Sequence, residues 1–191
     1  MTVLRGESHL GMAMSAGIIT AGTCFLVLKS PDFSESIKNA ATAFTGFMLD
    51  SGDMMPIIFV PIAIILFLIG AILPDIDTPY SMLGRFICLP FEHRTWTHAI
   101  WWPAALCVAG IWVRLLMWLG IGVFIHDFCD SFSASGLHWF YPIKNKNKHV
   151  LKLYHTGKGS EYAIVTISWV ITILYILFII QKVYHILDIA L

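Results

Sequence analysis

Long apolar runs separated by short polar segments make up most of the sequence. Five runs approach the length of a membrane-spanning helix: residues 10–28, 54–73, 97–113, 115–131 and 162–180. The third and fourth form one apolar stretch that is too long for a single helix, and we divide it at Arg114. Because a helix needs ~20 apolar residues to cross a bilayer, the pattern predicts an all-α transmembrane bundle of about five spans, with four to six compatible.

The segment between the first two runs has a different pattern. Residues 34–48 space their apolar side chains as an amphipathic helix does, which predicts a helix lying on the membrane surface. Apolar runs recur along the whole chain, so residues 1–191 are expected to form a single integral membrane domain. Small residues in the first run are expected to pack within the chain, and the oligomeric state stays open.

Composition supports the membrane assignment. The chain is 58% hydrophobic and 13% charged, with a mean hydropathy of +0.77. A soluble domain carries about 25% charged residues, so half of the usual charge is missing. The formal net charge is zero, which argues against a nucleic-acid partner and leaves membrane lipids as the expected one. The four cysteines are scattered and form no CxxC motif.

Basic residues predict the orientation. Five lysines lie in the loop before the last run: Lys144, Lys146, Lys148, Lys152 and Lys158. Loops rich in lysine and arginine favour the cytoplasmic side, so this loop and the N-terminus are expected there, in the inner membrane of the cell. The first three lysines could also attract anionic head groups, although a role in topology alone is the simpler interpretation.

Ionisable residues gather at particular ends of the apolar runs. They are His9 at the start of the first run, Asp75 and Asp77 after the second, His93, Arg94 and His98 before the third, and His126, Asp127 and Asp130 near the end of the fourth. In a five-span chain all these ends face the same side of the membrane. The spacing of four residues also places His126 and Asp130 on one helix face. We therefore expect one shared polar site at that surface.

Imidazole and carboxylate groups together indicate a metal site. They suit zinc, manganese or iron. The chain has no cluster of cysteines of the kind that holds a structural zinc. Two or three His with two or three Asp exceed the ligands of one zinc ion, which would allow a pair of metals. Taken singly, each signal has a simpler explanation, since Asp75 and Asp77 follow Pro74 in a turn-rich segment. A metal-ion or proton pathway is the main alternative, because transporters and channels use buried His and Asp too.

Four polar motifs, in order, carry a family resemblance. The segments SHLGMAMSAG at 8–17, LPDIDTPYSMLGR at 73–85, HRTWTH at 93–98 and HDFCDSFSASGLHWFYP at 126–142 resemble the YdjM-like family of membrane-bound proteins described as metal-dependent hydrolases. That family is similar, distantly, to zinc-dependent phospholipases C and single-strand nucleases. The resemblance implies metal ligands at His9, Asp75, His98, His126 and Asp130. Asp77, His93 and Arg94 also match polar positions of the family.

Combined, pattern and resemblance give a mechanistic hypothesis. One or two divalent metals, with zinc first and manganese or iron as alternatives, would serve a hydrolase that cleaves a phosphate-containing lipid at the membrane interface. Asp77 or His93 would exchange the proton, and Arg94 would hold a phosphoryl oxygen. An HExxH metalloprotease motif is absent, and the His residues are too few for a diiron oxidase. The polar residues gather at one face, which favours an enzyme over a transporter.

Overall fold

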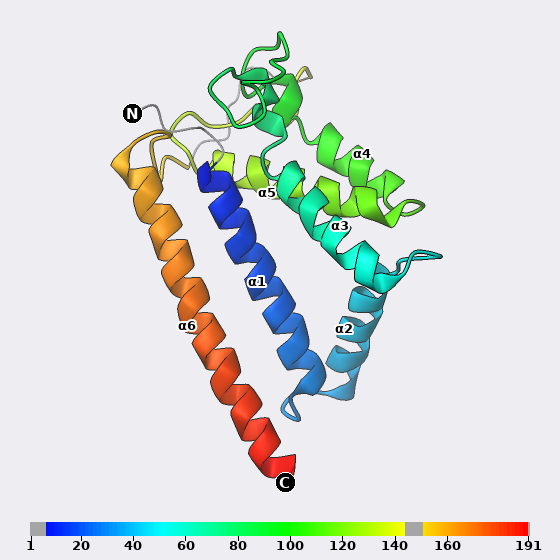
Figure 1. Cartoon of the computed structure of the whole chain (residues 1–191). Helices are drawn as coiled ribbons and strands as arrows, with labels where there is room; N and C mark the ends of the chain where they lie inside the picture. The colour runs from blue at the N-terminus through cyan, green and yellow to red at the C-terminus, as the bar shows by residue number, and fades with distance from the viewer. Residues whose placement is uncertain (1–6, 144–150, 191) are drawn as a thin grey trace.

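The computed structural model describes residues 7–143 and 151–190, and these form helices and loops without a strand. The elements are α1 (Glu7–Lys29), α2 (Glu35–Met48), α3 (Pro56–Gly70), η1 (Pro74–Asp77), η2 (Trp96–His98), α4 (Trp101–Ala109), α5 (Arg114–Ser131) and α6 (Gly159–Ala190), where η marks a 3-10 helix (Figure 1). The all-α class is confirmed, and α2 lies where the amphipathic pattern predicts a helix.

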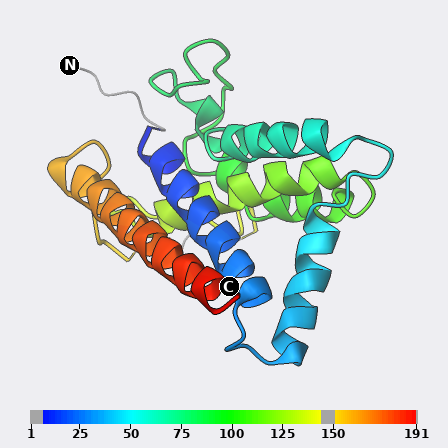
Figure 2. The same ribbon diagram turned by 60° about the horizontal axis from the view of Figure 1, so that its bottom comes forward.

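Helices α1 and α6 lie side by side and run in the same direction (Figures 1 and 2). Near their N-terminal ends, Ser15 Oγ lies 3.4 Å from Ser168 Oγ. Farther along, Thr23 Oγ1 lies 2.6 Å from the Tyr175 hydroxyl. Gly22 lets the two helices approach closely, because a Cβ added there would lie 2.4 Å from Ile179 Cδ1.

Two helices of the described residues are long and apolar enough to cross a membrane, fewer than the five spans expected from the sequence. They are α1, with 23 residues, and residues 159–184 of α6. Helix α3 has 15 residues and α4 has 9, both shorter than the ~20 that a bilayer core requires. Helix α5 has 18 residues but includes Arg114, Asp127 and Asp130.

The expected span at 97–113 is wrong because proline limits the helix. A helix starting at Thr97 would place Pro103 in its interior, where the ring clashes with the preceding turn and a hydrogen bond is lost. The chain instead forms the short η2, and α4 begins at Trp101, so that Pro103 falls in its first turn. Apolar composition continues through this interruption, which is why the run looks like one span.

The parallel arrangement of α1 and α6 requires the intervening chain to return. Figure 1 shows α2 and then α3 leading back from the far end of α1 to the end where α1 begins. Helices α4 and α5 then form a hairpin beside α3. The beginnings of α1 and α6, the end of α5 and both 3-10 helices consequently lie at one end of the molecule.

Helices α3 and α5 cross with their backbones nearly touching. A Cβ added to Gly122 would lie 2.1 Å from the carbonyl oxygen of Phe67, and one added to Gly70 would lie 2.2 Å from that of Leu119. Only glycine allows this approach. Beside the crossing, Ala13, Phe67 and Ala71 form a buried apolar cluster that joins α1 to α3. This cluster fixes the positions from which the polar residues of α1 and α5 extend.

Candidate metal centre

Polar side chains from four separate segments meet at the end of the molecule where α1 begins. They come from α1, η1, the loop ending in η2, and α5, and they are nearly inaccessible: His9 (3% exposed), Asp75 (3%), Asp77 (6%), His98 (0%), His126 (0%), Asp127 (0%) and Asp130 (1%). Burying this many ionisable groups costs free energy unless partners or a bound ion compensate. The predicted convergence of these residues is therefore present in the fold.

Four ligand atoms surround a common point. They are Nε2 of His98, Nε2 of His126, Oδ1 of Asp75 and Oδ2 of Asp130, and five of the distances between them fall between 3.3 and 4.0 Å. A zinc ion bound to four ligands at ~2.0–2.1 Å holds those atoms roughly 3.4 Å apart. The arrangement is therefore close to a tetrahedral ligand shell, slightly expanded.

Hydrogen bonds fix how the two imidazoles face this point. His126 Nδ1 lies 2.8 Å from the carbonyl oxygen of Ala71, which can only accept, so this nitrogen carries the hydrogen. The hydroxyl of Thr97 donates to Asp77 Oδ2, and its oxygen therefore accepts from His98 Nδ1 at 2.9 Å. In each neutral ring the lone pair is then on Nε2, the atom that faces the centre.

The arrangement of these four atoms calls for a positive group among them. The two Nε2 atoms lie 3.3 Å apart, and two lone pairs at that distance repel unless a cation or proton lies between them. Within the described residues, Oδ2 of Asp130 is buried without a hydrogen-bond partner. Native proteins rarely leave such an atom unsatisfied. The donor set and this orphan oxygen both fit a bound divalent metal.

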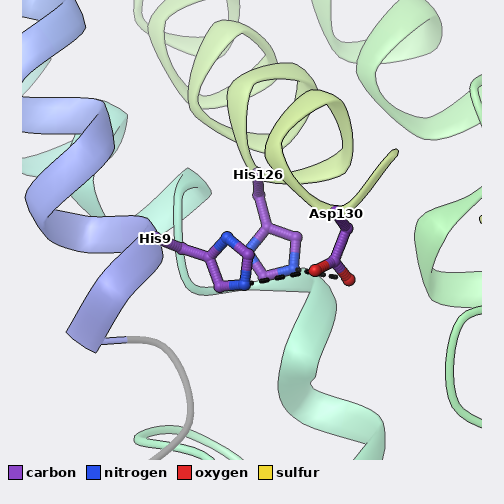
Figure 3. Close-up of side chains that lie close together, drawn as sticks. All are labelled: His9, His126 and Asp130. Carbon is purple, nitrogen blue, oxygen red and sulfur yellow. Dashed lines mark ion pairs between the residues drawn. The ribbon is translucent and has the colours of Figure 1, made fainter. Parts of the chain in front are cut away.

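The other oxygen of Asp130, Oδ1, is bound by His9 and Arg94, which are not among the four ligand residues. His9 Nε2 lies 3.3 Å from Oδ1, and Arg94 Nη2 donates to the same atom at 2.9 Å. Figure 3 shows His9 reaching from α1 toward the pair that α5 supplies, His126 and Asp130. The rings of His9 and His126 lie 4.1 Å apart between centroids. Ligand atoms of these three residues fall within 4.8 Å of one another, so His9 could serve a second ion.

Arg94 is tied mainly to protein groups. Its side chain is buried, and its guanidinium also donates to Ser133 Oγ at 2.7 Å and Thr156 Oγ1 at 3.1 Å. Both terminal nitrogens are engaged and orient Asp130, and within the described residues only Nε has no partner. Its backbone φ of 66° is rare for a residue with a side chain, which shows how strongly these contacts fix the loop.

His93 is the accessible member of the cluster. Its side chain is 26% exposed, and its Nδ1 lies 2.7 Å from Asp77 Oδ1. Its Nε2 lies 3.9 Å from Asp75 Oδ1, at the edge of the centre. Asp77 therefore accepts from His93 with one oxygen and from Thr97 with the other. It acts behind the ligands as a shared orienting carboxylate, as is common around metal sites.

The ionisation states outside the long helices suit metal binding. Burial raises the pKa of Asp75, but attraction to the neighbouring His126, His98 and His9 outweighs it, and the pKa falls well below its usual value. Burial lowers the pKa of His98, and attraction to the Asp75 and Asp130 carboxylates only partly offsets this. Asp75 is thus a carboxylate and His98 a neutral imidazole at neutral pH, the forms that bind metals.

Asp127 is the main residue that the predicted ligand set omits. It is fully buried, and neither of its carboxylate oxygens has a hydrogen-bond partner in the part of the chain that the structure describes. It also forms a ligand set with His98 and His126. The sequence signal was its position beside His126 and three residues before Asp130, on the same helix face. Thr97 and Ser133, which orient ligands, carried no comparable signal.

All eight predicted site residues lie in this cluster. The segment that carries Lys152 borders the end of α5, because the backbone N–H groups of Leu151 and Leu153 donate to the carbonyls of Ser131 and Phe132. Lys144, Lys146 and Lys148 lie outside the described residues. A model of the family described as YdjM inner membrane protein matches residues 6–186. The search of curated proteins and that of solved structures find no match.

Proposed function

The chain belongs to the YdjM inner membrane protein family, and on that premise we propose that it is a membrane-embedded, metal-dependent hydrolase. Its substrate would be a phosphoester of a lipid or lipid-linked molecule. The observation that carries the proposal is the shell of four ligand atoms, one of which is the buried, unpartnered Oδ2 of Asp130. Family membership supports the location, and the donor set supports the chemistry.

Asp75, His98, His126 and Asp130 would hold the first divalent ion, for which zinc is the best fit. A second position, if one is used, would take His9 with His126 and Asp130, or Asp127 with His98 and His126. A metal bound here would supply Lewis acidity, lowering the pKa of water and polarising a phosphoryl oxygen. Arg94 and Thr97 would keep Asp130 and His98 in position.

His93 is the residue best placed to move a proton. It lies at the edge of the centre, is partly exposed, and has its Nδ1 hydrogen held by Asp77. Its Nε2 is therefore available as a general base and, once protonated, as a general acid. The predicted proton role fits His93, whereas Asp77 would orient it.

The proposed site faces the cytoplasm at the level of the bilayer surface. His9 is the third residue of α1, so a metal centre here would lie at the start of a span. Lys152 lies in the segment that hydrogen-bonds to the end of α5, and Lys158 directly precedes α6. Lysine-rich loops favour the cytoplasmic side. Helices α2 and α3 would together provide the return path, and the α4–α5 hairpin would enter and leave from the site side. A lipid could then keep its tail in the bilayer while its head group reaches the centre.

The proposal is tested by phosphate release from vesicles. Zinc-loaded protein is reconstituted with phosphomonoester and phosphodiester lipids, beside Asp75→Asn and the control Asp53→Asn, which changes an exposed loop residue. Wild type and the control should cleave one lipid class, and Asp75→Asn should fall to background. Metal-loaded wild type that cleaves neither class, but dissipates an imposed pH gradient, would replace the hydrolase with the transport alternative.

A further inference from the structure

An apolar cavity of about 250 Å³ lies beside the metal centre. It is enclosed by η1, the loop leading into η2, α4 and α5. Its lining includes Pro74, Ile76, Phe91, Trp96, Leu106 and Val123. The polar groups at its wall have partners elsewhere, since the Thr97 hydroxyl donates to Asp77 and the Trp102 indole N–H donates to the Trp96 carbonyl. Water would therefore find few partners inside.

The cavity and the metal centre share two structural elements. Pro74 lines the cavity and directly precedes the ligand Asp75 in η1. Thr97 lines it and directly precedes the ligand His98 in η2. The hydroxyl of Thr97 also belongs to the hydrogen-bond network of the centre. A molecule that occupies the cavity would consequently have one end within a residue or two of the ligands.

Exposed aromatic side chains surround the cavity on its outer side. Phe91, Trp96 and Trp102 are 46%, 42% and 53% exposed, yet all three line the cavity. Beside them, Trp96 packs on Tyr141 with ring centroids 5.5 Å apart. Tryptophan and tyrosine collect where lipid tails meet water, because their rings have an apolar body and a polar edge. The cavity thus opens at the depth of the bilayer interface.

We propose that this cavity takes one hydrocarbon chain of the phosphate-bearing lipid whose head group binds at the metal centre. The inference rests on the proposed function and specifies its substrate class as a lipid with a long acyl or isoprenoid chain. Pockets that take a whole drug-sized ligand measure about 300–1,000 Å³, so this smaller cavity suits part of a single chain. The aromatic opening provides the path from the bilayer.

The test uses a phosphatidic acid that carries a photoactivatable diazirine in one acyl chain. Full-length protein in lipid nanodiscs is irradiated with this probe, and labelled peptides are identified by mass spectrometry. We compare wild type with Leu106→Trp, which fills the cavity, and with the matched control Val108→Trp. Val108 lies on the same helix but is 54% exposed and does not line the cavity. If the tryptophan variant misfolds, Leu106→Phe fills less of the cavity with a smaller side chain. The zinc bound by each variant shows whether it has folded.

Labelling of cavity residues in wild type and Val108→Trp, reduced about tenfold in a zinc-binding Leu106 variant, is the expected result. Equal labelling of these residues in all variants, or labelling confined to α1 and α6, would overturn the inference. Labelling does not depend on catalysis. If the probe labels the cavity but no phosphate is released, the lipid site is supported and the hydrolase function is rejected. If phosphate is released but the cavity is not labelled, the hydrolase function is supported and the lipid site is rejected.

Discussion

The two halves of α1 lie in opposite environments. Its buried residues are Ser8, His9, Ala13 and Ser15, all in the first half, where a histidine packs among carboxylates. The second half runs beside α6 with large apolar side chains such as Phe25 exposed. Polar groups are thus inside at one end and apolar groups outside at the other. The first arrangement calls for a bound cation, and the second for a surrounding lipid phase.

The difference between the two regions predicts where substitutions have large effects. A polar side chain in the centre is tied to several others, so its loss leaves buried partners without compensation. A polar side chain between α1 and α6 contributes one interhelical hydrogen bond, and its loss changes little else. Four substitutions, from the largest expected effect to the smallest, test this contrast.

Asp130→Ala should have the largest effect. It removes the acceptor of Arg94 and His9 and one proposed ligand, leaving a buried guanidinium without its carboxylate. Breaking a buried ion pair from one side costs about 3–5 kcal/mol. Thermal unfolding in detergent should show this loss together with loss of bound zinc, whereas Asp53→Ala in an exposed loop should match wild type. Wild-type unfolding of Asp130→Ala would contradict the assigned contacts.

Thr97→Val keeps the shape of the side chain and removes only the hydroxyl between His98 and Asp77. Losing a partner that orients a ligand typically lowers metal affinity by about 10–100-fold. Competition with a zinc chelator should measure this decrease. Thr42→Val on α2, whose hydroxyl donates to a carbonyl of its own helix, is the control. Equal affinities in the two variants would remove Thr97 from the centre.

Asp127→Leu should act in opposite directions with and without metal. The carboxyl group of Asp127 is buried and unpartnered within the described structure, so replacing it with an apolar side chain of similar size should stabilise the metal-free protein by about 1–3 kcal/mol. The same change should reduce the stabilisation that zinc adds. Unfolding with and without a chelator separates the two effects. A destabilised metal-free variant would show that the carboxylate has a structural role instead.

Thr23→Val should have the smallest effect. Its hydroxyl lies 2.6 Å from that of Tyr175 across the α1–α6 contact, in the second half of α1. Interhelical hydrogen bonds in membranes contribute about 0.6 kcal/mol on average. Unfolding should shift by no more than this, with zinc content unchanged. Loss of zinc in Thr23→Val would show that the helix pair and the centre are coupled, contrary to the comparison above.

The sequence predicts the polar cluster better than the membrane topology. The cluster can be predicted from the positions of His9, Asp75, His98 and His126, each of which stands at an end of an apolar run. If successive runs cross the membrane in opposite directions, these ends all meet at one side. The number of membrane spans depends on where each helix begins and ends. Pro103 shortens α4, and the apolar composition of the segment gives no sign of this. Short helices need tertiary neighbours, which the glycine crossing of α3 and α5 provides and the hydropathy pattern does not show.

Individual roles within the cluster needed the structure. From sequence, Arg94 beside a metal site suggests phosphate binding, and only its contacts with Asp130, Ser133 and Thr156 reveal an orienting role. Those partners lie 36 to 62 residues away along the chain, beyond the reach of any local pattern. Asp77 likewise changes from a proton carrier to the residue that holds His93 and Thr97.

The most direct test of the metal centre is the metal content per chain of the purified protein, measured by elemental mass spectrometry. Wild type, His126→Ala and His155→Ala are compared, the last replacing an exposed histidine outside the cluster. The account predicts about one or two zinc, manganese or iron ions per chain in wild type and His155→Ala, and their loss in His126→Ala. Wild type without stoichiometric metal after reconstitution, or full retention in His126→Ala, would contradict it.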